Sequence, residues 1–464
     1  RPRWSDIASG HELYNLGHLY EAAVAHHQAT GKRTLLDVAL KSADLLTREF
    51  GPGRRRDPPG HQEVEIGLVK LYRATGEKKY LDQARFFLEQ RGNAAGHTLY
   101  GAYSQDHVPV LQQTEAVGHA VRAGYMYSAM ADVGALAGDE GYVRALGGLW
   151  DNVVSRKLYL TGGIGARREG EAFGDDYELP NRTAYAETCA AIANAMWNHR
   201  LFLLHGDAKY LDVLERIVYN GFLSGVSLDG ERFFYPNPLA SDGERSFNMG
   251  QKGRSAWFDC SCCPTNVVRF LPSMAGYVYA QRERDVFVNL FVAGRGEVDV
   301  DGLKLGIRQE TRYPWEGRVR IVLEPGRPTE LALRVRVPGW AQGRPVPSDL
   351  YRYAEGGAEP FTLAVNGQPV TPEIVQGFAV LRRTWKAGDA VELSLPMPVR
   401  RVLSHEKVAA NAGRVAIERG PVVYCAEAAD NGGRAFNLVL PDDAPLEARH
   451  RGDLLGGGTV VSGR

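Results

Sequence analysis

Three cysteines and one glutamate in this sequence have side chains suited to binding a metal ion. Cys262 and Cys263 are adjacent in the segment WFDCSCCPTN, and Cys189 follows Glu187 closely in AYAETCAAIANAMWNH. Thiolates are preferred soft ligands of zinc, which is usually four-coordinate and tetrahedral. Three sulfurs and one carboxylate oxygen would complete such a shell. These residues therefore predict a zinc site, although their spacing matches none of the common zinc-finger patterns.

The predicted zinc has two interpretations that the ligand types do not separate. It could serve catalysis, or it could form a closed structural site that only ties the segment around Cys262 to a helical core. Residues two apart on a regular helix face different ways, so Glu187 and Cys189 can share a metal only where the helix begins late. Pro180 and Asn181, a few residues earlier, favour such a late start.

A glycine-rich acidic segment, TGGIGARREGEAFGDDYELPN, supplies candidate acids for catalysis. They are Glu171, Asp175, Asp176 and Glu178. The segment lacks the Gly-Lys-Ser/Thr ending of a P-loop and does not follow a predicted strand, so nucleotide binding is not indicated. It is predicted to be a long loop between helices. The alternative is a solvated acidic loop without chemistry.

Other residues that carry chemistry are less specific signals. Nine of the twelve histidines precede residue 200, and His18, His61 and His119 lie near predicted helix beginnings or on polar helix faces. Taken alone, each is better explained as a hydrogen-bonded structural histidine than as a sugar ligand. Cys425, in the segment VVYC, is predicted to be a small buried apolar residue.

The cysteine count and the charge balance limit the environment and the partners. Five cysteines are an odd number for a closed disulfide framework, and three lie within four positions. We therefore predict a reducing compartment, the cytoplasm. Lys plus Arg and Asp plus Glu both number 55, so no net charge favours nucleic acid or an anionic membrane. A neutral ligand such as a small carbohydrate is consistent with this balance.

The elements that must position these residues begin with helical hairpins. The phrases GKRTLL, GEKKYL, GDEGYV and GDAKYL begin at Gly31, Gly76, Gly138 and Gly206. Glycine suits the left-handed position after a helix, and the charges that follow suit the entry to the next helix. The glycines are separated by 45, 62 and 68 residues, which is too irregular for a solenoid. We therefore expect a closed α/α barrel with long loops at one end.

Near residue 281 the pattern changes to short alternating runs that predict β-strands. They are VFVNLFV, VRIVLE, LALRVRV, FTLAVNG, AVELSL, VAIERGPVVYC and FNLVL, separated by turn signals that include Asn366-Gly367. Such runs are typical of β-sandwiches. With a further boundary near residue 399, we predict an α/α-barrel catalytic domain over 1–280 and β-sandwiches over 281–398 and 399–464.

Several of these motifs together resemble glycoside hydrolase family 127. They are GGIG, GEAFG, YELPN, AYAETCA, ERIVYNG, CSCCPTN and VAIERGPVVYC, and they extend over essentially the whole chain. The ETC and CCP pair is specific to this group and its close relatives. The resemblance implies an (α/α)6 barrel followed by β-sandwich domains, and the activity of a β-L-arabinofuranosidase.

The resemblance also implies roles for individual residues. Zn²⁺ would be bound by Glu187, Cys189, Cys262 and Cys263. Cys262 would be the nucleophile and Glu171 the general acid/base of a retaining exo-hydrolase. The sugar contacts that it implies come from His18, His61, His119, Glu215 and Tyr235.

In this family the chain would begin inside the second helical pair. We therefore expect a barrel that is incomplete at its N-terminus and a last sandwich that is truncated. Neither gap removes a residue with an implied catalytic role.

Three alternatives stay open at this point. The same scaffold and mechanism could act on a different sugar. The chain could be a non-catalytic carbohydrate-binding protein with structural zinc, which would have no need of an acid at Glu171. An inverting hydrolase with two carboxylates would leave the four clustered ligands unexplained. The oligomeric state is open as well, and a homodimer is one assembly that we consider.

Overall fold

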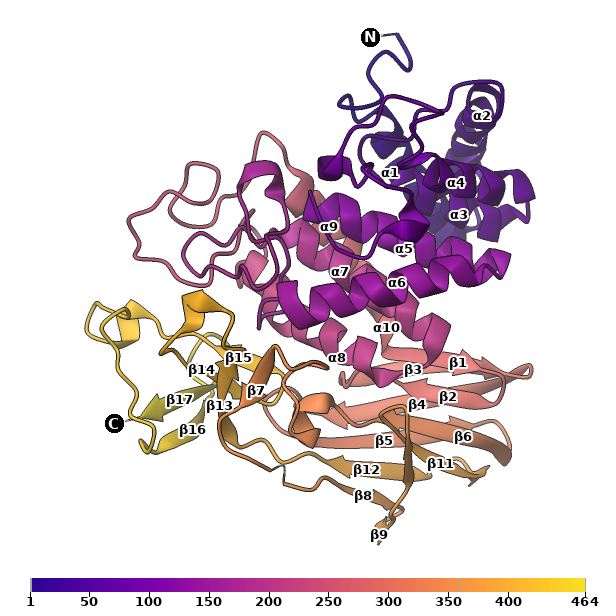
Figure 1. The fold of residues 1–464 in the computed structure, drawn as a ribbon. Helices are drawn as coiled ribbons and strands as arrows, with labels where there is room; N and C mark the ends of the chain where they lie inside the picture. The colour runs from indigo at the N-terminus through magenta and orange to yellow at the C-terminus, as the bar shows by residue number, and fades with distance from the viewer. Residues whose placement is uncertain (1, 358, 464) are drawn as a thin grey trace. The chain divides into compact units, whose positions relative to one another are not determined.

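The computed structural model describes residues 2–357 and 359–463 (Figure 1). Its internal contacts divide the chain into two compact units. Unit 1 contains the residues up to 158 together with 164–204, and unit 2 contains 159–163 and the residues from 205 onward. Unit 1 is helical, and the strands described below lie in unit 2. The predicted order, a helical part followed by β-sheets, is therefore confirmed.

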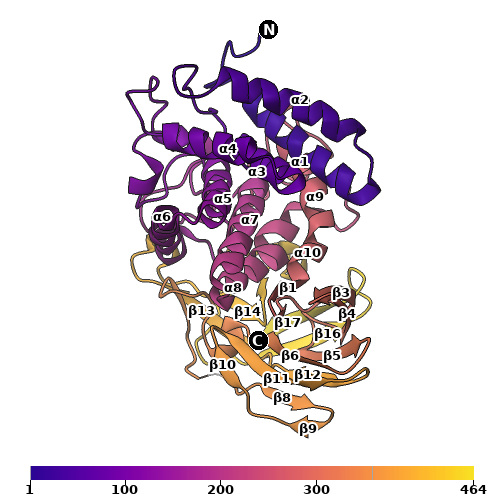
Figure 2. The ribbon, with the colours of Figure 1, turned by 90° about the vertical axis from the view of Figure 1, so that its right-hand side faces the viewer.

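Unit 1 is built from helices arranged in successive hairpins. They are α1 (Glu12–Thr30), α2 (Thr34–Glu49), α3 (Val64–Thr75), α4 (Lys78–Gln90), α5 (Ala120–Ala137), α6 (Glu140–Asn152) and all but the last residue of α7 (Thr188–His205), with the short turns η1 (Ala102–Ser104), η2 (Val110–Gln112), η3 (Val153–Lys157) and η4 (Glu169–Glu171). Helix α1 packs against α2 and α3, α3 against α4 and α5, and α5 against α6 (Figure 2). Among the described residues, no helix has both the length and the hydrophobicity needed to cross a membrane.

The glycines predicted to end helices do so. Gly31, Gly76 and Gly138 follow α1, α3 and α5 with φ of 69°, 75° and 64°, and Gly206 follows α7 with φ of 70°. A side chain would be strained in this left-handed conformation, whereas glycine adopts it freely. The helical-hairpin prediction is therefore confirmed at these joints, while closure into a barrel stays a prediction.

Unit 2 begins with helices and continues as β-sheets. Its helices and turns are α8 (Ala208–Arg216), η5 (Ile217–Phe222), η6 (Leu223–Gly225), α9 (Cys262–Phe270), η7 (Leu271–Met274), α10 (Ala275–Val278), η8 (Gly339–Gln342), η9 (Ala409–Asn411) and η10 (Ala428–Asp430). A long stretch without helices or strands, residues 226–261, connects η6 to α9.

The strands of unit 2 form four sheets. The strands are β1 (Tyr279–Arg282), β2 (Asp285–Val288), β3 (Gly294–Val300), β4 (Leu303–Thr311), β5 (Arg318–Pro325), β6 (Thr329–Arg336), β7 (Tyr351–Tyr353), β8 (Thr362–Val365), β9 (Gln368–Pro369), β10 (Glu373–Val375), β11 (Phe378–Trp385), β12 (Ala390–Ser394), β13 (Val399–Ser404), β14 (Ala416–Arg419), β15 (Val422–Tyr424), β16 (Leu446–Arg451) and β17 (Gly458–Gly463). One sheet has the order β1-β2-β6-β11-β10, and a second has the order β3-β4-β5-β12-β8-β9. The others are β15-β14-β13-β7 and the pair β16-β17.

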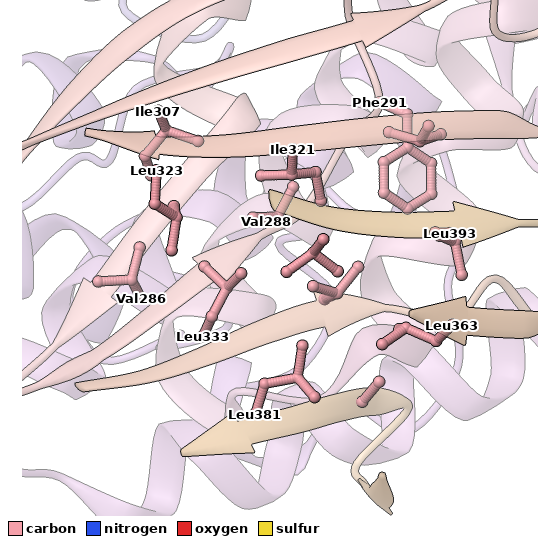
Figure 3. Packing of buried hydrophobic residues seen from close by; sticks show 14 of the residues in the cluster. Val286, Val288, Phe291, Ile307, Ile321, Leu323, Leu333, Leu363, Leu381 and Leu393 are labelled. Carbon is pink, nitrogen blue, oxygen red and sulfur yellow. The ribbon is translucent and has the colours of Figure 1, made fainter. Parts of the chain in front are cut away.

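The five-stranded and six-stranded sheets share one hydrophobic core. Alternate residues point to one face of a strand, so Val319, Ile321 and Leu323 of β5 lie on the same side. Leu331, Leu333 and Val335 do the same in β6. Figure 3 shows side chains from the strands of both sheets meeting in this cluster. Period-two alternation in the sequence thus has its expected cause, the burial of one face of each sheet.

The predicted Asn366-Gly367 turn is confirmed. It joins β8 to β9 with φ of 51° and 75° at the two residues. Both central residues of a type I′ turn need positive φ, which Asn and Gly adopt at little cost.

Two sequence predictions are wrong near the C-terminal end. The run FNLVL is not a strand, and Val439 within it is 87% exposed. An apolar run forms a strand only where a neighbouring strand can pair with it, and none pairs with this one among the described residues. Cys425 is exposed rather than buried, because it lies just after β15 ends.

We expect Leu333→Ala to destabilise unit 2 by about 2–5 kcal/mol, since it removes a fully buried side chain and leaves a cavity. Ile374→Ala, on the edge strand β10 with 41% of the side chain exposed, should change stability by less than about 1 kcal/mol. Denaturant midpoints of the two variants measure this difference. Equal shifts would contradict the core described above.

Candidate active site

The start of α7 explains how Glu187 and Cys189 can point to one place. Ala186 has a φ of 40°, and the helix begins only at Thr188. The backbone carbonyl of Glu187 accepts the first helical hydrogen bond, from the N–H of Ala191 at 3.0 Å. Glu187 therefore lies outside the regular helix and Cys189 within its first turn. The late helix start predicted from the sequence is confirmed, and both side chains are buried.

Glu171 lies at the tip of a tight hairpin in unit 1. The backbones of Arg167 and Ala172 exchange two hydrogen bonds of 3.0 Å, which close the turn around η4. Gly170 and Glu171 both have positive φ, 69° and 50°. This part of the acidic segment is therefore a defined turn and not a loose solvated loop.

The other three candidate acids have a different environment, because each pairs with an arginine. The Asp175 carboxylate is 2.9 Å from an Arg167 nitrogen, and Asp176 is 2.6 Å from Arg156. Glu178 accepts a hydrogen bond of 2.9 Å from Nε of Arg167. These ion pairs fix the loop, whereas the partner of Glu171 is a histidine, His119.

Two hydrogen bonds orient the Glu171 carboxylate. Oε2 is 2.8 Å from Nε2 of His119, and Oε1 accepts a 2.9 Å hydrogen bond from the hydroxyl of Tyr185. Nδ1 of His119 accepts from the backbone N–H of Val121 at 3.2 Å, because His119 caps the N-terminus of α5. Since Nδ1 is an acceptor, the imidazole proton lies on Nε2 and is donated to Glu171.

The charge states of this pair follow from burial and hydrogen bonding. Burial acts to raise the pKa of Glu171, but the hydrogen bonds from His119 and Tyr185 outweigh it and lower the pKa below its usual value. Burial also lowers the pKa of His119 in spite of its carboxylate partner. The pair is therefore a carboxylate that accepts from a neutral imidazole. Ligand atoms of His119, Glu171 and Glu187 all lie within 4.8 Å of one another.

The predicted histidines of unit 1 are brought together beside this pair. The rings of His61 and His119 are 5.6 Å apart, and Tyr14 lies 4.3 Å from His61 and 4.5 Å from His18 between ring centroids. Nδ1 of His61 donates to the backbone carbonyl of Gln62 at 2.8 Å, which directs Nε2 the other way. A wall of imidazole and phenol rings suits the hydroxyls and the apolar ring of a sugar.

Sequence reasoning missed Tyr14 and Tyr185, which contact the predicted residues directly. Tyr14 lies one helical turn before His18 on α1, so helical spacing from His18 could have indicated it. Tyr185 lies two residues before Glu187, but nothing local to it indicates a contact with the loop at Glu171.

In unit 2, Cys262 is the first residue of α9 and contacts Tyr235. Its Sγ is 2.9 Å from the hydroxyl of Tyr235, and Sγ of Cys260 lies 4.0 Å from the same hydroxyl. Cys262 is half-buried, whereas Cys263 is fully buried.

Tyr235 is held by Asn248, which sequence reasoning also missed. The side-chain oxygen of Asn248 accepts the backbone N–H of Tyr235 at 2.7 Å, and its amide nitrogen donates to the carbonyls of Phe233 and Gly253. Asn248 is fully buried in a stretch without regular structure. The Asn248 side chain thus makes the hydrogen bonds that a neighbouring strand would otherwise supply. It fixes the Tyr235 hydroxyl beside Cys262.

Glu215 lies in a network of polar partners inside unit 2. Its carboxylate accepts from the hydroxyl of Tyr313 at 2.7 Å, from Arg336 and from the indole N–H of Trp340 at 3.3 Å. The side chain is 1% exposed. Both oxygens are engaged inside unit 2, as a buried carboxylate requires. The sugar contact that the family resemblance implied for Glu215 stays a prediction.

Two groups of side chains deserve comparison as metal ligands. The first group, called here the candidate metal-ligand cluster, consists of the four predicted zinc ligands: Glu187 and Cys189 around the start of α7 in unit 1, and Cys262 and Cys263 at the start of α9 in unit 2. In unit 1, His18, Glu21 and Glu63 also offer ligand atoms within 4.8 Å of one another. The ammonium of Lys70 already lies 2.5 Å from Glu21. This side-chain cation would compete with a metal ion for the carboxylate of the second group. The first group is the better candidate.

Comparisons with known proteins place the chain in a family. The β-L-arabinofuranosidase GH127 catalytic domain matches residues 1–276, the GH127 middle domain matches 285–397, and the glycoside hydrolase family 127 C-terminal domain matches 399–451. A non-reducing end β-L-arabinofuranosidase of Bifidobacterium longum subsp. longum is 38% identical, over 99% of this chain and 72% of that protein.

Solved structures agree with these matches. A GH127 β-arabinofuranosidase is 51% identical with a TM-score of 0.94, over 99% of this chain and 72% of that one. A GH127 β-L-arabinofuranosidase from Geobacillus stearothermophilus T6 is 43% identical with a TM-score of 0.91, over 99% and 74% of the two chains. With three family domains matched in order and relatives this similar over nearly its whole length, the chain belongs to glycoside hydrolase family 127.

Proposed function

We propose that this glycoside hydrolase releases β-L-arabinofuranose from the non-reducing end of oligosaccharides or glycoconjugates, with retention of configuration. Cys262 is the nucleophile and Glu171 the general acid/base. The relative from Bifidobacterium longum is named for this activity. The observation that carries the proposal is the orientation of Glu171 by His119 and Tyr185, because a binding protein has no need of a carboxylate held in this way.

Zinc fits the donor set of the candidate metal-ligand cluster. The carboxylate of Glu187 and the thiolates of Cys189, Cys262 and Cys263 would hold it, and three sulfurs with one oxygen are characteristic zinc ligands. A bound zinc ion keeps its thiol ligands deprotonated at neutral pH.

In the first step Glu171 protonates the departing oxygen. Sγ of Cys262 forms a bond to the anomeric carbon while the bond from that carbon to the aglycone oxygen breaks. Glu171 must carry a proton at this point, although its hydrogen bonds favour the carboxylate.

In the second step Glu171 acts as a base. It takes a proton from water, the water oxygen attacks the anomeric carbon, and the carbon–sulfur bond breaks to restore the Cys262 thiolate. Two displacements at one carbon retain its configuration. The His119 N–H holds the carboxylate in the ionised form that this step requires, and the Tyr235 hydroxyl can donate to the departing thiolate.

The wider architecture belongs to the same proposal. The helical part closes as an (α/α)6 barrel, and the sheets form β-sandwich domains, with domain limits at 1–280, 281–398 and 399–464. His18, His61, His119, Glu215 and Tyr235 contact the sugar. The five cysteines form no disulfide among the described residues, which favours the cytoplasm.

We expect about one zinc ion per chain in protein purified without chelators. Cys263→Ser should lose most of the metal, because a hydroxyl is a poor zinc ligand. Cys425→Ser, which changes an exposed cysteine, should keep it. Metal analysis of the three proteins is the measurement, and a wild-type protein without zinc would exclude the site.

Glu171→Gln should lower kcat/KM on an arabinofuranosyl disaccharide by at least about 100-fold while zinc stays bound. With a p-nitrophenyl leaving group the loss should be smaller, because that group departs with little protonation. Glu169→Gln, an exposed neighbour in η4, is the matched control and should behave as wild type. Near wild-type hydrolysis of the disaccharide by Glu171→Gln would remove Glu171 from the mechanism.

An arabinofuranosyl haloacetamide separates the nucleophile from the other thiols. Halide displacement should attach the label to Cys262 and leave Cys260 and Cys263 unmodified, since only one sulfur is placed at the anomeric carbon. Cys262→Ser should retain the fold but lose hydrolysis. Peptide mass spectrometry that finds the label on another cysteine, or on a carboxylate, would overturn the assignment.

A further inference from the structure

An exposed aromatic ring lies beside the Glu171 hairpin in unit 1. Tyr103, in η1, is 45% exposed. A side-chain carbon added to Gly170 would lie 3.4 Å from Cδ2 of Tyr103, so the ring borders the backbone next to Glu171. Its centroid is 5.6 Å from that of His119, the hydrogen-bond partner of Glu171. The ring is thus an immediate neighbour of the acid/base pair.

The backbone of Tyr103 is fixed against the segment that carries His119. The N–H of His119 donates to the carbonyl of Tyr103 at 3.1 Å. Gly118 has a φ of 69°, and a Cβ there would lie 2.0 Å from the carbonyl oxygen of Ala102. Only glycine allows so close an approach, so Tyr103 and His119 are positioned as one unit.

One face of the Tyr103 ring is already covered. The guanidinium carbon of Arg122 lies 4.5 Å from the ring centroid, over the ring. Arg122 is 4% exposed and is itself held by the hydroxyl of Ser104 at 3.1 Å and by the carbonyl of Gly60. A cation–π contact with a buried, anchored guanidinium fixes the plane of the ring. The exposed part of the ring must therefore lie away from Arg122.

The proposed mechanism indicates which part of the substrate would contact the exposed part of the Tyr103 ring. A general acid lies within hydrogen-bond distance of the oxygen that it protonates, so the leaving group must lie next to Glu171. A sugar ring has a face of C–H groups, and a tyrosine ring offers a flat apolar surface of similar size. An ordered and exposed ring at this place suits a cyclic leaving group better than a linear chain.

We propose that Tyr103 forms the leaving-group subsite and selects substrates in which a second sugar ring is the aglycone. The inference rests on the proposed function, because it takes Glu171 as the general acid. It assigns to Tyr103 a contact with substrate and no part in proton transfer.

The test compares two substrates, an arabinofuranosyl disaccharide and methyl β-L-arabinofuranoside, whose aglycone has no ring. Tyr103→Ala should lower kcat/KM by roughly tenfold on the disaccharide and by less than about twofold on the methyl glycoside. Tyr103→Phe keeps the ring and should behave as wild type on both. Leu111→Ala, which removes a side chain of 47% exposure near the start of α6, is the control for a general surface effect.

The outcomes distinguish the inference from the function on which it rests. Equal losses of kcat/KM by Tyr103→Ala on the two substrates would overturn the role of the ring, as would a Tyr103→Phe variant as poor as Tyr103→Ala. In either case hydrolysis by the wild type would still uphold the proposed function. A wild-type protein that hydrolyses neither substrate would overturn the proposed function, and the subsite with it.

Discussion

The hydrogen bond between His119 and Glu171 is the interaction on which the chemistry of unit 1 depends. It joins two segments that are far apart in sequence, the cap of α5 and the hairpin closed by Arg167 and Ala172. Because Nδ1 of His119 is committed to the N–H of Val121, the tautomer is set by the start of a helix. The start of α5 therefore determines that Nε2 of His119 carries the proton facing the Glu171 carboxylate.

Maintaining this arrangement requires backbone conformations that most residues avoid. Glu171 and Ala186 have φ of 50° and 40°, although neither is a glycine. Left-handed residues of this kind are destabilised by about 1–3 kcal/mol each and persist where the surroundings determine them. Ala186 is held by a 2.7 Å hydrogen bond to the carbonyl of Gly165. The two strained residues lie at Glu171 and next to Glu187, so local strain accompanies the placement of the two carboxylates to which we assign roles.

Sequence reasoning succeeded where the cause is local or where a motif is specific. Gly31 ends its helix because only glycine is unstrained there, and Asn366 with Gly367 forms the turn that those residue types favour. The late start of α7 was foreseen from a simple conflict between helical spacing and a shared metal. Family motifs supplied the candidate residues, and His61 and His119 do lie together with Glu171.

It failed where partners come from distant parts of the chain. No residue near Glu215 in the sequence indicates that its carboxylate accepts hydrogen bonds from Tyr313 and Arg336, about one hundred residues later. In the sequence, Asn248 is an ordinary polar residue of a loop. Its role in holding Tyr235 follows only from its three backbone partners in the structure. Likewise FNLVL has the composition of a strand, but strand formation depends on a neighbour that composition cannot reveal.

The two adjacent thiols at the start of α9 illustrate how position separates roles that residue type leaves equal. Both lie in the first turn of α9. Cys263 is fully buried, and a buried sulfur can ligate a metal but cannot reach a substrate without displacing its surroundings. Cys262 is half-buried and faces a tyrosine hydroxyl 2.9 Å away. Of this pair, only Cys262 has both the partial exposure and the hydroxyl partner that suit the proposed nucleophile.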